Sequence, residues 1–134
     1  AVAALAMLGA PVVTPGPLRL LCIGLGGGSI PAFLAGLLPH CRVDVVELEP
    51  AVIRAAAEAM GFREGPRLRA VAADGAEFAL REAASAGGEG AYDAVLVDAY
   101  DALGRVPEEL RAAEGGLARA LQQGLLRRQA GVVA

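Results

Sequence analysis

The sequence predicts an α/β protein with three layers, in which helices cover both faces of a mostly parallel sheet. Short apolar runs of strand length alternate with segments that suit helices, from about residue 18 to Ala134. Strands that alternate with helices form parallel sheets whose faces the helices cover. A glycine-rich turn, Gly24-x-Gly26-x-Gly28, joins the first apolar run to the first helical segment. Glycines let the backbone turn sharply there and let a ligand approach the chain closely.

The first half of the chain supplies the turn and two strands. The elements expected there are a helix and a proline-rich lead-in over 1–17, a strand at 18–23, a helix at 29–38, a strand at 43–48 and a helix from Pro50 to Met60. Both strands are apolar runs of strand length, and the run after the turn is compatible with a helix. Proline is favoured in the first turn of a helix, and Gly61 is placed to end the second one.

The second half continues the alternation. The expected elements are a strand at 68–73, a helix from Gly75 or Ala76 to about Ala84, a strand at 92–97, a helix at 114–128 and the start of a fifth strand at 131–134. The apolar core of the fourth strand, Ala94-Val-Leu-Val97, predicts burial on both faces. The glycine-rich stretch 85–90 is a flexible connection. Because the sheet is truncated after its fifth strand and would expose an unpaired edge, we expect the chain to be part of a longer protein.

Length and composition limit the class of protein. The 134 residues allow one small domain, and residues 18–134 are expected to form part of it. The net charge of −3 argues against a nucleic-acid partner, which needs a basic face. No apolar stretch reaches the ~18 residues of a membrane span. Cys22 and Cys41 should lie too far apart on adjacent parallel strands to form a disulfide. Buried free thiols favour a reducing compartment, so a cytoplasmic location is expected.

Acidic residues follow three successive strands. They are Glu47 and Glu49 after the second strand, Asp74 after the third, and Asp98 and Asp101 after the fourth. The carboxyl ends of parallel strands share one edge of the sheet, where open α/β sheets bind ligands. Glu47 lies 19 positions after Gly28, which suits a carboxylate that binds ribose hydroxyls. The sequence therefore predicts a pocket with an acidic rim and the glycine turn at its centre, with the arginines mainly in helices and at strand starts.

Each acid also has a structural interpretation. Asp and Glu are common before helices, where they cap or complement the positive helix end. Capping competes with ligand binding at Asp74, and capping or contact with solvent is the favoured interpretation of Glu49. Asp98 is favoured as a ligand or catalytic contact, whereas Asp101 stays open between such a contact and loop solvation. Tyr100, in the same loop, either lines the pocket or packs.

His40 is the only histidine. It precedes the second strand at the opposite edge of the predicted sheet, so a structural or solvent role is expected. Ser-His-Asp chemistry would need this histidine at the other edge. No cluster of Cys, His and acidic residues has the spacing of zinc ligands, so no metal is expected.

The glycine turn departs from the dinucleotide-binding fingerprint. Ser29 stands where that fingerprint, G-x-G-x-x-G/A, needs Gly or Ala. With its Gly24-x-Gly26-x-Gly28 turn, an acid after the second strand and acids after the next two, the chain instead resembles the class I S-adenosylmethionine-dependent methyltransferases, which have a Rossmann-like fold. S-adenosylmethionine carries an ammonium and a sulfonium but no pyrophosphate, so a carboxylate-rich pocket suits it electrostatically.

Four segments narrow the resemblance to the spermidine-synthase-like branch, which contains aminopropyltransferases and methyltransferase-like protein methyltransferases. They are Leu21–Pro31, Val46–Pro50, Ala73–Gly75 and Tyr92–Asp101. Aminopropyltransferases usually carry Gly-Gly-Gly-Asp-Gly in the first loop, where this chain has Ser29 in place of the Asp. Proline is common in them where this chain has Ala102. These differences favour methyl transfer over polyamine synthesis.

The resemblance implies a role for each site residue. For the cofactor, Gly24, Gly26 and Gly28 would cradle the methionine part, Glu47 would bind the ribose hydroxyls, and Asp74 would contact the adenine amino group with Gly75 beside it. For catalysis, Asp98 would lie near the amino group of the cofactor or the attacking amine, and Asp101 would be the second acid of the Asp-x-x-Asp that holds a polyamine.

The function implied is transfer of a methyl group from S-adenosylmethionine to an amine of a protein or small molecule. The alternatives are a polyamine aminopropyltransferase and a non-catalytic remnant that binds the cofactor. The resemblance implies a small-molecule cofactor and an acceptor amine or protein substrate as partners, with no nucleic acid and no membrane. The identity of the acceptor and the question of a homodimer stay open.

Overall fold

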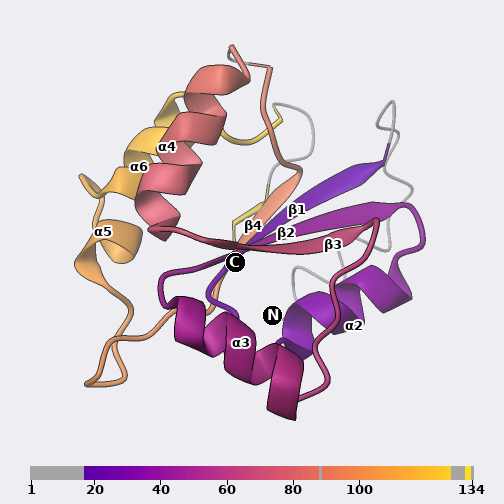
Figure 1. The fold of residues 1–134 in the computed structure, drawn as a ribbon. Helices are drawn as coiled ribbons and strands as arrows, with labels where there is room; N and C mark the ends of the chain where they lie inside the picture. The colour runs from indigo at the N-terminus through magenta and orange to yellow at the C-terminus, as the bar shows by residue number, and fades with distance from the viewer. Residues whose placement is uncertain (1–16, 88, 128–131, 134) are drawn as a thin grey trace.

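The computed structural model describes residues 17–87, 89–127 and 132–133. Its sheet has five parallel strands in the order β3-β2-β1-β4-β5 (Figure 1). The strands are β1 (Leu18–Ile23), β2 (Cys41–Glu47), β3 (Leu68–Ala72), β4 (Ala94–Val97) and β5 (Val132–Val133). The chain winds from β1 out to β3 and then crosses back to β4 on the other side of β1. The strand order therefore reverses between β1 and β4.

Helices cover both faces of this sheet. They are α2 (Ser29–Leu37), α3 (Pro50–Ala59), α4 (Gly75–Ser85), α5 (Glu108–Arg111) and α6 (Gly116–Gln122). Figure 1 shows α2 and α3 on one side of the strands and α4 and α6 on the other, and α5 packs against α6. The predicted three-layer α/β/α fold is confirmed, with every strand pair of the described residues parallel.

Two apolar cores fill the space between the layers. Side chains alternate along β1, so Leu20 and Cys22 enter one core while Leu21 and Ile23 enter the other. The core beneath α2 and α3 also holds Leu34, Val43, Val45 and Phe62, and the core beneath α4 and α6 holds Val46, Phe78, Val95 and Leu117. Burial on both faces explains why the central strands are nearly continuous apolar runs.

Two strands begin at a different residue than predicted, and β2 and β3 each end one residue earlier than predicted. β2 begins at Cys41 instead of residue 43, because Cys41 pairs with Leu18 in the ladder with β1. β4 begins at Ala94, and its predicted start at Tyr92 is wrong. The Tyr92 N–H donates to the carbonyl of Leu125 (3.1 Å), and Tyr92 forms an isolated bridge with Leu126. Burial of β4 on both faces holds for Ala94 and Val95, whereas the last two residues of the strand are half-buried.

The single helix predicted over 114–128 is also wrong. Within that range the structure has only the shorter helix α6 (Gly116–Gln122), and α5 (Glu108–Arg111) precedes it. Gly115 has extended backbone at the N-cap of α6 and packs so tightly on α5 that a Cβ there would meet the Glu109 carbonyl oxygen. At the other end, Gly124 adopts a φ of 91° and the Leu125 N–H donates to Ala120 (3.0 Å). This glycine-based Schellman motif ends the helix well before residue 128.

The remaining predictions concern the ends of the chain and the cysteines. The expected fifth strand is present as Val132–Val133, paired with β4, while the expected N-terminal helix lies outside the described residues. Cys22 and Cys41 are buried and free, as predicted. Among the described residues, no helix has the length and apolar character needed to span a bilayer.

Candidate functional site

The fold brings four loops together at the carboxyl edge of the sheet. The Gly24 N–H donates to the Val46 carbonyl (2.8 Å), which ties the glycine turn to the end of β2. On the outer side of β2, the Ala73 N–H donates to the Glu47 carbonyl (3.0 Å), one residue before Asp74. On the other side of β1, the Asp98 N–H donates to Ile23 (2.8 Å). Because neighbouring strands lie ~4.8 Å apart, the loops that carry Asp74, Glu47, Gly24 and Asp98 form a row across the sheet edge.

The three glycines of the turn are required for different reasons. All three have positive φ, 98° at Gly24, 51° at Gly26 and 78° at Gly28, a conformation that L side chains rarely adopt. A Cβ at Gly24 would also strike the carbonyl oxygen of Asp98, and one at Gly28 would strike the ring of Phe62. A Cβ at Gly26 would meet no described atom. The turn is thus pressed against β4 and the α3–β3 loop at its two ends and is open in the middle.

Glu47 connects the end of β2 to the glycine turn. One carboxylate oxygen, Oε2, accepts the Leu25 N–H (2.9 Å), and the other, Oε1, accepts the Glu49 N–H (3.0 Å). The side chain is half-buried. A carboxylate has about four lone-pair positions, so each oxygen can still accept one more donor. Glu47 therefore fixes the turn and keeps acceptor capacity toward a ligand.

The acids ahead of α3 and α4 differ from each other. Asp74 is the N-cap of α4, and its Oδ1 accepts the Glu77 N–H (2.9 Å); Asp74 therefore caps the helix, and its contact with a ligand stays a prediction. Its other oxygen has no hydrogen-bond partner among the described residues. Glu49 occupies the N-cap position of α3 but makes no side-chain cap bond and is exposed to solvent. Beside Asp74, Gly75 packs so closely on β1 that a Cβ would collide with Ile23.

The two acids after β4 are placed differently. Asp98 is exposed directly at the strand end, next to the glycine turn. Asp101 is engaged within its own turn, where its Oδ1 accepts the N–H groups of Leu103 (2.8 Å) and Arg105 (2.9 Å). The hydrogen bond from the Arg105 backbone holds the pKa of Asp101 below its usual range. Among the described residues, the polar contacts of Asp101 stay inside its own loop. The structure therefore joins Asp98 to the row and leaves Asp101 beside it. Tyr100, between them, is 63% exposed.

Some features of the site and its surroundings escaped the sequence analysis. The Leu25 N–H and the ring of Phe62 support the glycine turn, and nothing in their residue types signals this. Asp44 is also buried, at 7% exposure, in the middle of β2. Its signal was present, because an acid interrupts the apolar run Val43-Asp-Val-Val. His40 is exposed just before β2, at the edge away from the row, as predicted.

Comparison with known sequences identifies two groups of relatives. The eEF1A lysine and N-terminal methyltransferase of Mus musculus is 37% identical over 98 residues, which cover 72% of this chain and 14% of the relative. The polyamine aminopropyltransferase of Vibrio vulnificus is 37% identical over 100 residues, which cover 75% of this chain and 32% of the relative. The chain thus spans only a small part of the length of these relatives. No protein-family model matches it.

Solved structures with the same fold include a methyltransferase-like protein and spermidine synthases. Human Methyltransferase-like protein 13 in complex with SAH has a TM-score of 0.81 at 27% identity, over 98% of this chain and 60% of that one. A spermidine synthase in complex with the transition-state analogue AdoDATO has a TM-score of 0.64 at 23% identity, over 84% of this chain and 37% of that one, and shows the fold alone. By its sequence relatives and its fold, the chain belongs to the class I S-adenosylmethionine-dependent methyltransferase superfamily, in the branch that contains both the methyltransferase-like proteins and the spermidine synthases.

Proposed function

We propose that this chain forms the cofactor-binding part of an S-adenosylmethionine-dependent methyltransferase that transfers a methyl group to an amine of a protein or small molecule. The observation that carries the proposal is the row of Asp74, Glu47, Gly24 and Asp98 at the point where the strand order reverses. The methyltransferases among the sequence relatives and the structural neighbours support it.

The residues of the row suit this cofactor chemically. The glycine turn leaves open space at Gly26, where a ligand can approach the backbone. Glu47 has lone pairs left for the ribose hydroxyls, and Asp74 has one oxygen left for the adenine amino group. Three carboxylates near one turn favour a ligand that carries positive charge.

When bound, S-adenosylmethionine supplies an electrophilic methyl group on a positively charged sulfur. The chain contributes mainly position, because displacement at a methyl group needs the acceptor held in line and close. Glu47 holds the turn and the ribose at the same time. Asp98, exposed at the end of β4, orients the acceptor amine or accepts its proton.

Aminopropyl transfer is the second candidate. The spacing Asp98-x-x-Asp101 and the 37% identity to a polyamine aminopropyltransferase favour it. Against it stand Ser29 in the first loop and the engagement of Asp101 by the Leu103 and Arg105 N–H groups, which occupies the acid that would hold a polyamine. A third candidate is cofactor binding without transfer.

Calorimetric titration with S-adenosylmethionine and with its decarboxylated form tests these candidates. We expect the carboxylated cofactor to bind more tightly, and Glu47→Ala to weaken it about tenfold or more, because hydrogen bonds to a carboxylate are lost. Glu49→Ala is the matched control, since this neighbouring acid is exposed and makes no cap bond. The affinity of the Glu49→Ala variant for S-adenosylmethionine should stay within about twofold of that of the unmodified chain.

The outcomes separate the candidates. Equal affinity in Glu47→Ala and the unmodified chain, with both shown to be folded, would remove Glu47 from the site. Tighter binding of the decarboxylated form, with product formed from putrescine, would favour the aminopropyltransferase. Tight binding with no transfer by the full-length protein to any amine acceptor would favour the non-catalytic interpretation.

A further inference from the structure

A second recess lies at the amino ends of β1, β2 and β3, at the opposite edge of the sheet from the cofactor row. It has a volume of about 410 Å³ and is lined by Arg19, Arg42, Asp44, Arg69 and the loop 65–67. Volumes of this size are typical of small-molecule sites. A strand of six residues such as β1 is ~20 Å long, so the two sites are well separated.

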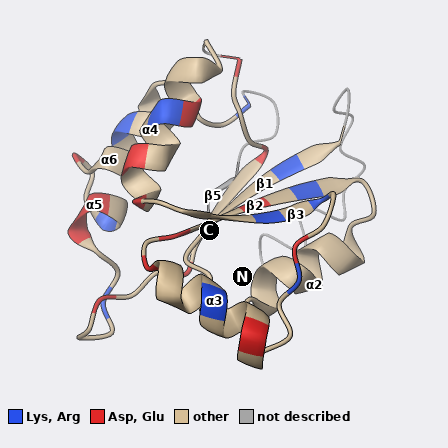
Figure 2. Ribbon diagram, in the orientation of Figure 1, with Lys and Arg blue, Asp and Glu red and all other residues tan. Residues whose placement is uncertain are grey.

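The strand register gathers the charged side chains of the recess on one face. Arg19 pairs with Arg42 across β1 and β2, and Asp44 pairs with Arg69 across β2 and β3. Because side chains alternate, these residues share the face that further along the strands carries Leu21 and Val46. Figure 2 shows the resulting basic bands on β1, β2 and β3.

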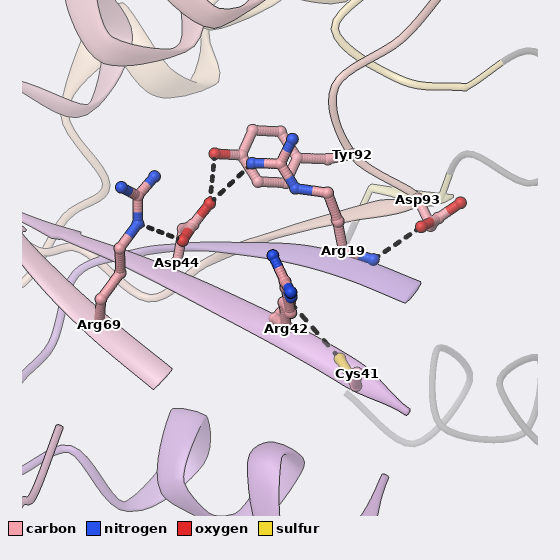
Figure 3. Close-up of polar contacts among 7 residues, drawn as sticks. All are labelled: Arg19, Cys41, Arg42, Asp44, Arg69, Tyr92 and Asp93. Carbon is pink, nitrogen blue, oxygen red and sulfur yellow. Dashed lines mark hydrogen bonds and ion pairs between the residues drawn. The ribbon is translucent and has the colours of Figure 1, made fainter. Parts of the chain in front are cut away.

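Asp44 holds two of the arginines in place. Its carboxylate accepts hydrogen bonds from Arg19 (3.1 Å), from Arg69 and from the Tyr92 hydroxyl (2.8 Å) (Figure 3). Burial alone would raise the pKa of Asp44, but the hydrogen bonds from Arg69 and Tyr92 outweigh it and the pKa lies below its usual range. The Arg19 guanidinium also lies over the Tyr92 ring, 4.8 Å from its centroid. Both guanidinium groups are therefore ordered before any ligand arrives.

Positive charge remains after this network is complete. Four arginines line the recess, Arg19, Arg42, Arg67 and Arg69, against the single acid Asp44. The Arg67 guanidinium donates to the carbonyl oxygens of Ala35 and Leu38. The Arg42 guanidinium is exposed and has no hydrogen bond or ion pair with the described residues. Arg19 and Arg69 each donate to Asp44 through a single guanidinium nitrogen. Because a guanidinium carries five N–H donors, each arginine keeps several donors for a ligand. The recess thus combines ordered, unused donors with an excess of positive charge in a chain whose net charge is −3.

We propose that this recess binds a phosphate-bearing anion, with the phosphate group between Arg42 and the guanidinium groups of Arg19 and Arg69. The planar fork of arginine matches phosphate oxygens two at a time. Ordering of Arg19 and Arg69 by Asp44 lowers the entropy that binding would cost. The same chemistry serves a free phosphate compound and a phosphoserine of another polypeptide.

Calorimetry at fixed ionic strength tests the proposal, with inorganic pyrophosphate as the probe for a free compound and a phosphoserine peptide as the probe for a modified polypeptide. We expect saturable binding of at least one probe, weakened about tenfold by Arg42→Gln through loss of a charged hydrogen-bond donor. Arg54→Gln is the matched control, because Arg54 is exposed on α3, away from the recess, and the same charge is removed. The stronger probe identifies the source.

Two results would overturn the proposal. One is that neither probe binds saturably at concentrations up to ~10 mM, because a dissociation constant above this value is weaker than that of a specific site. The other is equal weakening by Arg42→Gln and Arg54→Gln, which would indicate a general effect of net charge. Thermal melting checks that both variants fold, and S-adenosylmethionine titration of Arg42→Gln shows separately whether the cofactor site is intact.

Discussion

Glu47 and Gly24 show how single residues position the glycine turn. Glu47 accepts the Leu25 N–H (2.9 Å), so an acid suited to a ribose also sets the conformation of the loop beside it. Gly24 brings the turn against the end of β4, where a Cβ would strike the Asp98 carbonyl. The turn is therefore held from β2 and β4 together. A change at either residue should alter both the stability of the fold and the shape of the site.

Replacement of the glycines separates conformational strain from close packing. Gly24→Ala should lower the free energy of unfolding by roughly 3 kcal/mol, because a positive φ and a backbone collision act together. Gly26→Ala has the positive φ without the collision, so a loss of about 1 kcal/mol is expected. Urea denaturation of the two variants measures the difference. Equal losses would show that the approach of β4 to the turn does not constrain Gly24.

At the scale of elements, the sequence predicted the strands and the first three helices after residue 18 to within about two residues, and the last helix poorly. The apolar run at 18–23 is β1 without change, because burial on both faces leaves a continuous signal. The helix expected over 114–128 is confined to Gly116–Gln122, because Gly115 packs against α5 before it and Gly124 closes a Schellman motif after it. Such contacts depend on which helices meet, which a local pattern does not contain. The position of Glu47 at the end of β2 was predictable from the sequence, whereas its bond to the Leu25 N–H depends on the folded turn.

The cap of α4 provides a test at this scale. Asp74→Ala should lower the free energy of unfolding by about 1 kcal/mol, since the Glu77 N–H loses its acceptor. Glu49→Ala removes an acid from the N-cap position of α3, where no side-chain bond exists, and should change stability by less than about 0.5 kcal/mol. Chemical denaturation measures both. Similar effects of the two changes would argue that the cap bond contributes nothing.

At the scale of the whole molecule, charge is separated between the two edges of the sheet. Acidic residues meet at the carboxyl edge, as the positions of Glu47, Asp74 and Asp98 after their strands predicted. Arg19 and Arg42 lie near strand starts, also as predicted. The sequence did not reveal that Asp44 joins Arg19 to Arg69, because the pairing of β2 with β1 and β3 is a property of the assembled sheet.

This ion-pair network predicts a pH dependence of stability. The pKa of Asp44 is lower in the folded chain than its usual value, so its contribution is fully present above about pH 4 and is lost as the pH falls through the folded-state pKa. At pH 7 the free energy of unfolding of the unmodified chain should be roughly 2 kcal/mol higher than that of the Asp44→Asn variant. This difference should shrink below about pH 4. Urea denaturation across pH 3–7 measures the gap. A gap that stays constant down to pH 3 would show that ionisation of Asp44 is not its source.

The buried cysteines give the sheet two internal probes of its opening. Burial raises the pKa of Cys22 to about 12 and that of Cys41 to about 11, so neither thiol forms appreciable thiolate at neutral pH while the fold is closed. Cys41 lies at the first residue of β2 and Cys22 lies near the end of β1. The rate at which a thiol reagent modifies each cysteine in native buffer therefore reports how often that position becomes transiently exposed. Faster modification of Cys41 would show that the arginine-lined edge frays, and equal rates would show that the central strands separate in one cooperative event.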